Sequence, residues 1–293
     1  MTATAPSAFA ARLQTYASFV RFSHSVFALP FALVGALLAT RVTAFTWDKL
    51  IWIVACMVFA RSAAMGFNRL ADARFDARNP RTSMRELPRG RMSTREAIAF
   101  VLVSSALFVA ATVPLGWLCV LLSPVALAIV FWYSLAKRYT NYTQLFLGLA
   151  MAVAPVGGWI AAGGRGGWEP WLLGLAIGTW VGGFDVLYAC QDFDVDRRDG
   201  LKSIPVRFGI RQSIAISRAM HVLAVLCLTL AGAAAGLGRI YFAGVTGVAA
   251  LLVWEQSMVS ADDLSQVKRA FDMNGWVGIL YLVTTAVAIY WPR

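Results

Sequence analysis

Side chains that bind hard cations recur at helical spacing at two points in this sequence. Asn68, Asp72 and Asp76 stand four residues apart in the stretch GFNRLADARFDARNPRT. Residues four apart lie on nearly the same face of an α-helix, so these three oxygen-bearing side chains share one stripe. We refer to them as the first ladder.

A second ladder follows in GFDVLYACQDFDVDRRDGLKS, and its members are Asp185, Asp192, Asp196 and Asp199. Their spacing again predicts one helical face, with Tyr188 beside it and Asp194 pointing elsewhere. Like charges four residues apart destabilise a helix by roughly 0.2–0.5 kcal/mol a pair, so the ladders need a counter-charge. A bound cation supplies one. Pairing of solvated helix ends with loop arginines is the alternative, and it leaves the coincidence of two ladders unexplained.

Magnesium is the cation that this pattern favours. Mg²⁺ prefers oxygen ligands, keeps several waters, and joins a few carboxylates to substrate phosphates. Two ladders therefore suit two or more ions bound together with a diphosphate. Basic residues near the ladders are able to bind the remaining phosphate oxygens. They are Arg69, Arg81, Arg85, Lys137, Arg138, Lys202 and Arg207.

The composition places the ladders in an all-α integral membrane protein. Hydrophobic residues make up 59% and charged residues 14% of the chain, far from the balance of a soluble domain. Apolar runs long enough to cross the hydrocarbon core predict about nine helices. They lie near residues 19–40, 47–66, 96–113, 115–135, 144–163, 170–190, 213–236, 239–259 and 274–291. The breaks at Pro114 and Gly116, and at Gly236 and Leu237, are short, so eight or ten helices remain open.

The distribution of charge predicts the topology. With nine spans, nineteen Lys and Arg residues fall on the side of the N-terminus and five on the opposite side. The positive-inside rule then places the N-terminus and both ladders toward the cytoplasm, in a multi-pass protein of the inner (cytoplasmic) cell membrane. We expect residues 1–18 to form a cytoplasmic segment without a cleavable signal peptide, and residues 19–293 to form one membrane domain. Basic residues split among short loops argue against a nucleic-acid partner.

Arg61 lies inside the second apolar run, seven residues before Asn68 and on the same helical face. A buried arginine needs a partner. One interpretation is an ion pair with a residue such as Asp185, or a side chain that extends to the interface. The other is an anchor for a substrate carboxylate. A membrane cavity behind the ladders would hold the apolar tail of a lipid diphosphate, and an allylic diphosphate is able to ionise to a carbocation.

Other conspicuous residues have structural interpretations. His24 and His221 are each solitary among apolar residues, and we expect them to make ordinary helix contacts. Four cysteines without metal-type spacing fit small-side-chain packing, and they are Cys56, Cys119, Cys190 and Cys227. Tryptophans near the predicted helix ends fit a membrane-interface belt, and they are Trp47, Trp117, Trp168, Trp171 and Trp291.

These motifs resemble those of a known family. NRLADARFDARNPRT is similar to the first NxxxDxxxD signature of the UbiA superfamily of intramembrane prenyltransferases, and YACQDFDVDRRDGLKS is similar to its second aspartate-rich signature. FSHSVFALPFAL, YSLAKRYTNYTQLFLGLAMAVAPVGGWIA and WEQSMVSADDLSQVKRAF resemble the 4-hydroxybenzoate polyprenyltransferase-like branch. The similarity covers nearly the whole chain, and the paired signatures are far more specific than a single DxxxD.

The resemblance implies a nine-helix bundle that transfers a polyprenyl group from polyprenyl diphosphate to an aromatic acid of the 4-hydroxybenzoate type, in quinone biosynthesis and with Mg²⁺. The residues that it implies as metal ligands are Asn68, Asp72, Asp76, Asp192 and Asp196. Lys137, Arg138 and Lys202 would lie at the diphosphate, and Arg61 matches the family's arginine that faces the aromatic acid.

The same resemblance implies an electrophilic aromatic substitution. Departure of diphosphate leaves an allylic cation, which the ring carbon ortho to a hydroxyl attacks. Tyr188 or Tyr133 would steady this cation through its ring face. Asp185 or Asp192 would accept the ring proton.

Three alternatives remain at this point. YACQD followed by RRDGLKSIPVRFG resembles the menaquinone-type futalosine branch equally well, so 1,4-dihydroxy-6-naphthoate is an alternative acceptor. A cation-coupled transporter would use intramembrane carboxylates, but these ladders lie at helix ends rather than at the midplane. A phospholipid-type alcohol transferase is also metal-dependent, but the glycine and alanine-arginine spacing expected in its aspartate signature is absent.

Overall fold

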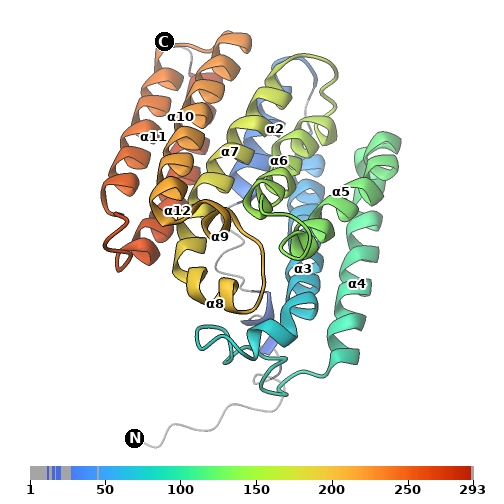
Figure 1. Cartoon of the computed structure of the whole chain (residues 1–293). Helices are drawn as coiled ribbons and strands as arrows, with labels where there is room; N and C mark the ends of the chain where they lie inside the picture. The colour runs from blue at the N-terminus through green and yellow to red at the C-terminus, as the bar shows by residue number, and fades with distance from the viewer. Residues whose placement is uncertain (1–11, 13–14, 17, 21–27, 45, 292–293) are drawn as a thin grey trace, which may run out of the picture.

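The chain folds as a bundle of helices. The computed structural model describes residues 12, 15–16, 18–20, 28–44 and 46–291, and within these residues it has no β-strand. The helices are α2 (Leu29–Ala39), α3 (Trp47–Asp76), α4 (Thr94–Thr112), η2 (Val113–Leu115), α5 (Trp117–Ala136), α6 (Thr143–Ala161), α7 (Glu169–Ala189), η3 (Cys190–Asp192), α8 (Phe193–Arg198), α9 (Ile204–Phe208), α10 (Ile210–Ala234), α11 (Arg239–Ser257) and α12 (Val267–Tyr290). Figure 1 shows α10, α11 and α12 on one side of α7, and α3, α4 and α5 on the other.

The all-helical membrane architecture is confirmed. Seven helices in the described part of the chain are long and apolar enough to cross a membrane. They correspond to seven of the nine predicted spans. The other two predicted spans contain α2, which has 11 residues, and α11, which carries Arg239 and Glu255 near its ends. His24 and the first part of the predicted span 19–40 lie outside the described residues.

Two short breaks between predicted spans are real helix boundaries. Gly116 separates α4 and η2 from α5 and has a φ of 112°, and Gly236 separates α10 from α11 with a φ of 60°. Both values lie in the left-handed region, which glycine enters without the steric cost that a Cβ would bring. These glycines therefore end one helix and redirect the chain into the next.

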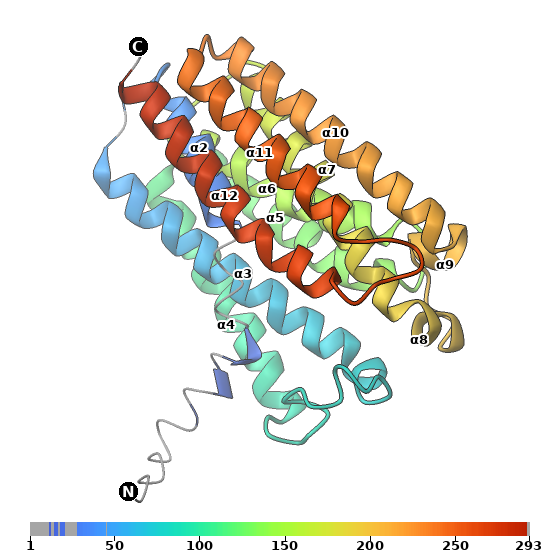
Figure 2. The ribbon, with the colours of Figure 1, turned by 90° about the vertical axis from the view of Figure 1, so that its left-hand side faces the viewer.

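Close packing of helix backbones holds α2 against α6. A Cβ added to Gly158 of α6 would lie 2.0 Å from the carbonyl oxygen of Ala32 in α2, and one added to Gly35 would lie 2.0 Å from that of Pro155. Only glycine fits at such a crossing, which is how membrane helices approach closely without a hydrophobic driving force. The helix most enclosed by its neighbours is α7, with α6 and α10 packed on either side of it (Figure 2).

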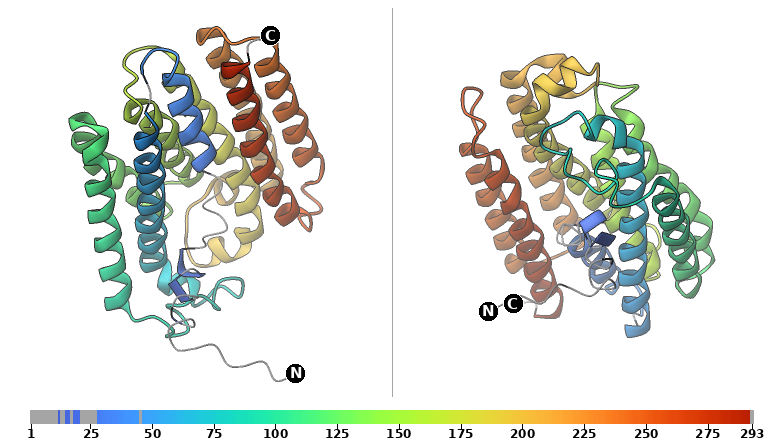
Figure 3. Two further views of the ribbon diagram at one scale, coloured as in Figure 1. Left: turned by 180° about the vertical axis from the view of Figure 1, so that it is seen from behind. Right: turned by 90° about the horizontal axis from the view of Figure 1, so that it is seen from below.

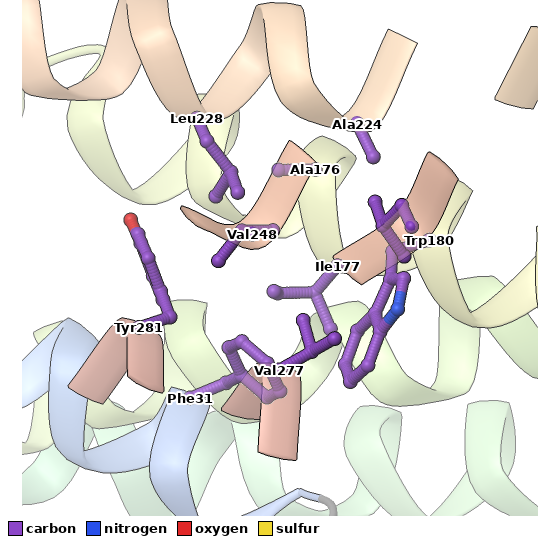
Figure 4. Close-up of a pocket in the computed structure, with 10 residues that line it drawn as sticks. Phe31, Ala176, Ile177, Trp180, Ala224, Leu228, Val248, Val277 and Tyr281 are labelled. Carbon is purple, nitrogen blue, oxygen red and sulfur yellow. The ribbon is translucent and has the colours of Figure 1, made fainter. Parts of the chain in front are cut away.

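Apolar side chains fill the bundle behind α7. Figure 4 shows Phe31, Ile177, Trp180 and Tyr281 around a small pocket. Its volume is about 10 Å³. This volume holds about one water-sized sphere, and its lining offers too few polar partners to keep a water there. The pocket is therefore a small gap in the packed core.

The first ladder is carried by a helix longer than the predicted span. The apolar run was expected to end at residue 66, but α3 continues without a break to Asp76, a length of 30 residues. Such a helix is about 45 Å long, whereas the hydrocarbon core of a bilayer is roughly 30 Å thick. The helix is therefore longer than the core is thick, and the ladder lies on its final turns, after the apolar run.

Candidate active site

Both ladders line one cavity. The cavity has a volume of about 320 Å³ and lies between α3, α5, α6, α7 and α12. It is at the end of the bundle where the 77–93 loop and α8 are found, and Figure 3 shows that loop lying across this end. Polar residues of helix ends and loops surround its mouth, and its inner end is lined by residues from within the helices, most of them apolar. The two ladders, which are far apart in the sequence, thus line the same cavity.

The first ladder faces cations from two directions. Lys137 Nζ, at the end of α5, lies 2.7 Å from Asp72 Oδ2. Arg85 Nη1, from the 77–93 loop, lies 2.7 Å from both carboxylate oxygens of Asp76. Asn68 Nδ2 lies 3.4 Å from Asp72 Oδ2. Asp72 and Asp76 are both buried, so these ion pairs offset the cost of taking two carboxylates out of water.

The aspartates of the second ladder lie on one face although α7 does not continue through them as one regular helix. After Ala189 the chain tightens into the 3₁₀ turn η3 and then forms α8. The side chains that line the cavity from this segment include Asp185, Asp192, Asp196 and Asp199. Asp194 is exposed and does not line it. The predicted face is therefore confirmed.

Two residues of the 77–93 loop bridge the ladders. Arg81 Nη2 lies 2.5 Å from Asp192 Oδ2, Arg81 Nη1 donates to Tyr188 Oη at 3.0 Å, and Asn79 Nδ2 donates to Asp192 Oδ1 at 3.3 Å. Burial tends to lower the pKa of Arg81, but its hydrogen bond to Asp192 and that residue's charge outweigh burial, so the pKa is raised overall. Arg81 is thus a permanent cation at the mouth of the cavity.

Backbone contacts join the loops on the opposite side of the mouth. Lys202 N donates to the carbonyl oxygen of Lys137 at 2.9 Å, and Thr143 Oγ1 donates to that of Lys202 at 2.9 Å. Lys202 lines the cavity, and its Nζ donates to the carbonyl oxygen of Tyr139 at 3.2 Å. Two of the three basic residues expected at the diphosphate, Lys137 and Lys202, are therefore brought together here.

Arg61, Tyr133 and Asp185 line the inner part of the same cavity. Arg61 is seven residues from Asn68, which is about two turns or 10 Å further along α3. The aromatic residues nearby are in contact: the ring centroid of Phe271, in α12, is 5.3 Å from that of Phe184 and 4.8 Å from that of Tyr188. The inner end therefore combines an arginine with aromatic walls.

Two predicted substrate-binding arginines do not line the cavity. Arg69 is buried on another face of α3, where its Nε donates to the carbonyl oxygen of Phe19 at 3.4 Å. Arg138 lies behind Asp72, with Nη2 bonded to the carbonyl oxygen of Ala71 and 3.8 Å from Asp72 Oδ1. Neither side chain is at the cavity wall, and a role in substrate binding stays a prediction for both. Arg69 follows the cavity-lining Asn68 in α3, and one step along a helix turns a side chain by about 100°. Arg138 lies in the turn after α5, next to the cavity-lining Lys137.

The donor set fits a hard divalent cation when a diphosphate is also bound. Every candidate ligand at the ladders offers oxygen, and Asp72 Oδ1 is buried with no hydrogen-bond donor among the described residues. No three acidic, histidine or cysteine side chains in the described part of the chain are close enough to hold an ion alone. Mg²⁺ commonly uses one or two carboxylates and completes its shell with water and substrate phosphates. Pairs of ladder residues suit that arrangement.

The sequence patterns missed several polar residues of the cavity. Asn79, Thr82, Ser134, Gln144 and Ser203 line it. The clearest signal in the sequence was Gln144, a polar residue at the start of an apolar helix. In the structure its side chain is only 3% exposed. Phe271 was missed because nothing in its local sequence distinguishes it from other apolar residues of α12. By contrast, the expectation for His221 is confirmed, since its Nε2 lies 3.3 Å from the carbonyl oxygen of Trp180 and its Nδ1 lies 3.1 Å from Gln256 Nε2.

Comparisons with known proteins identify the family of the chain. The model of the UbiA prenyltransferase family matches residues 28–278. The chain is 32% identical over 248 residues to the 4-hydroxybenzoate octaprenyltransferase of Vibrio campbellii, covering 84% of this chain and 86% of that protein. It is 35% identical over 228 residues to the protein of the same name from Pseudomonas putida strain W619, covering 76% of this chain and 75% of that protein.

Solved structures show the same fold. The apo structure of a UbiA homologue from Aeropyrum pernix superposes with a TM-score of 0.83 at 37% identity, covering 90% of this chain and 98% of that one. A UbiA homologue from Archaeoglobus fulgidus, bound to DMAPP and Mg²⁺, superposes with a TM-score of 0.69 at 18% identity, covering 93% and 99%. The second likeness is one of fold alone.

Proposed function

Because this chain belongs to the UbiA prenyltransferase family, we propose that it transfers a polyprenyl group from polyprenyl diphosphate to the ring of 4-hydroxybenzoate in quinone biosynthesis. The observation that carries the proposal is the single cavity, which has both acidic ladders at its mouth and Arg61 at its inner end. The names of the curated relatives favour 4-hydroxybenzoate over 1,4-dihydroxy-6-naphthoate as the acceptor. A transporter needs no aromatic-acid site behind its carboxylates.

The mouth of the cavity binds the diphosphate. Arg81, Arg85, Lys137 and Lys202 surround it and supply donors to the phosphate oxygens. Asn68, Asp72, Asp76, Asp192 and Asp196 would hold two or more Mg²⁺ ions, whose charge stabilises the departing diphosphate. Arg138, although it is not at the wall, donates a hydrogen bond to the carbonyl oxygen of Ala71 in α3 and so supports the first ladder.

The inner end of the cavity binds the acceptor. Arg61 anchors the carboxylate of 4-hydroxybenzoate and turns the hydroxylated edge of the ring toward the mouth. The carbon–oxygen bond of the substrate breaks, diphosphate leaves with the bonding electrons, and the ring carbon ortho to the hydroxyl attacks the allylic cation. The rings of Tyr133, Tyr188 and Phe271 lie along this cavity and stabilise positive charge through their faces.

A carboxylate completes the reaction by taking the proton from the attacked ring carbon. Asp185 and Asp192 both line the cavity. Asp192 is held by Arg81 at 2.5 Å, whereas Asp185 lies about two turns nearer to the acceptor end. We therefore assign the role of proton acceptor to Asp185. Aromaticity is restored as the proton leaves, and the products are a prenylated ring, diphosphate and one proton.

The topology proposed from the sequence suits this chemistry. Nine spans would arise if the predicted span 19–40, which contains α2, and α11 cross the membrane with the seven long apolar helices. Residues 1–18 then form a cytoplasmic segment and residues 19–293 one membrane domain. The cavity mouth faces the cytoplasm from the inner membrane, on the side with the excess of Lys and Arg.

The test is a transfer assay in membranes that contain the protein. Radiolabelled polyprenyl diphosphate is supplied with Mg²⁺ or EDTA, and with 4-hydroxybenzoate or 1,4-dihydroxy-6-naphthoate, and lipid-soluble product is extracted. We expect a product that requires both Mg²⁺ and 4-hydroxybenzoate. Product with only the naphthoate would contradict the acceptor, and no product with either acceptor from folded protein would contradict the function.

A further inference from the structure

Gln144 is a buried amide at the mouth of the cavity. It lies in the first turn of α6, is 3% exposed, and lines the cavity beside Thr143 and Ser203. A primary amide has two acceptor sites on its oxygen and two N–H donors on its nitrogen. Burying it is costly unless these groups are used, so each end of the amide should have a partner in the working protein.

The oxygen of this amide has a fixed partner. Ile204 N, at the start of α9, donates to Gln144 Oε1 at 3.1 Å. Ile204 is itself 2% exposed, so its N–H needs that acceptor. The reversed amide would set two donors against each other. Hydrogen bonding therefore fixes the orientation of the side chain, with Nε2 directed away from Ile204.

The nitrogen of the amide is not used by the protein. None of the described residues accepts a hydrogen bond from Gln144 Nε2, and Nε2 is not among the polar atoms sealed from solvent without a partner. Because Gln144 lines the cavity, its Nε2 remains available as a donor to a molecule bound there.

The position of Gln144 along α6 tells which part of a substrate it meets. Leu147 and Met151 line the cavity one and two turns further along the same helix, toward its apolar end. Gln144 is at the polar end, next to the loops in which Lys202 N donates to the Lys137 carbonyl oxygen. The amide thus lies at the level of the cations, away from the acceptor end.

We propose that Gln144 binds the diphosphate of the prenyl substrate, by donating from Nε2 to a non-bridging phosphate oxygen. This inference rests on the proposed function, and it adds a neutral donor to a site otherwise built of cations and metal ligands. The amide is fixed in advance by Ile204, so it loses little conformational freedom when the substrate binds. Hydrogen bonds to charged groups are among the stronger ones.

The decisive variant is Gln144→Glu. It preserves size and an oxygen acceptor for Ile204 N–H, but it replaces the N–H donors with a carboxylate that repels phosphate. Binding of a non-reactive farnesyl thiolodiphosphate is measured by titration calorimetry with purified protein and Mg²⁺. We expect the Kd to rise at least about tenfold, with the Kd for 4-hydroxybenzoate unchanged.

A matched control is Gln191→Glu. Gln191 is exposed, lies next to Asp192 in sequence, and does not line the cavity. The variant adds the same charge at the same end of the molecule and should bind the analogue within about twofold of the wild type. Gln144→Glu that binds the analogue as the wild type does would overturn the proposal. If Gln144→Glu does not fold, Gln144→Met decides by the same criterion.

Different results would contradict the proposed function and the role of Gln144. Wild-type protein that binds the thiolodiphosphate but does not prenylate 4-hydroxybenzoate would contradict the acceptor and leave the Gln144 assignment intact. Wild-type protein that does not bind the analogue would contradict both.

Discussion

Arg81 Nη2 lies 2.5 Å from Asp192 Oδ2, so a side chain from the loop after the first ladder closes on the second ladder. The two residues are 111 positions apart in the sequence. Asn79 of the same loop reaches the same carboxylate. The loop that follows one acidic segment is thereby fixed to the other segment at one edge of the cavity, and the Arg81 cation lies at the mouth that we propose for the diphosphate.

Replacing Arg81 should weaken diphosphate binding. Arg81→Ala removes a permanent cation and leaves Asp192 without its ion pair. We expect KM for polyprenyl diphosphate to rise by at least about tenfold in the transfer assay, with a small change in KM for 4-hydroxybenzoate. Arg89→Ala, in the same loop but exposed and outside the cavity, is the control and should retain both values. Equal behaviour of the two variants would rule out a role for Arg81.

Removing one ladder carboxylate should stop the reaction in a protein that still folds. Asp72→Asn or Asp192→Asn loses a ligand for Mg²⁺, and metal charge supplies several kcal/mol at the leaving group, so kcat/KM should fall by at least about 100-fold. Asp194→Asn is the matched control, because Asp194 belongs to the same segment but is exposed and away from the cavity. Transfer is measured against Mg²⁺ concentration. Full activity of either ladder variant would refute the metal assignment.

Arg61→Ala should mainly affect the acceptor. Loss of a charge-assisted contact to the carboxylate is expected to raise KM for 4-hydroxybenzoate about 10- to 100-fold, with KM for polyprenyl diphosphate little changed. Methyl 4-hydroxybenzoate provides the control, because it has no charged carboxylate to anchor. The wild type and the variant should use this ester with similar kcat/KM. If the variant loses activity equally with acid and ester, Arg61 stabilises the structure instead.

The crossing of α2 and α6 offers a test of stability independent of chemistry. Gly158→Ala places a methyl group 2.0 Å from the carbonyl oxygen of Ala32, so the two helices must separate. We expect a loss of roughly 1–3 kcal/mol, seen as a lower Tm in detergent. Gly157→Ala is the control, because a Cβ there meets no atom within 4 Å. Its Tm should be unchanged or slightly higher, since alanine favours a helix over glycine.

Helical periodicity accounts for the success at the ladders. It placed Asn68, Asp72 and Asp76 on one face, and it separated Asp194 from the other aspartates of the second ladder even though η3 interrupts the helix there. The same rule, applied to Arg69, would have placed it about 100° away from Asn68. Arg69 was selected by its charge alone. Arg138 was selected by charge and by the family resemblance, and it lies in the turn after α5, where helical periodicity does not apply.

The sequence by itself determined the chemistry of this protein and its setting: oxygen ligands at helical spacing, basic residues near them, and apolar runs long enough for a membrane. These properties are local, since they depend on residue type and on a period of 3.6 residues. Only the tertiary structure decided that both ladders line one cavity, that Arg81 bridges them, and that Gln144 and Phe271 join them. Loops such as 77–93 have no periodic pattern, and their conformation depends on contacts with residues far away in the chain, such as Asp192.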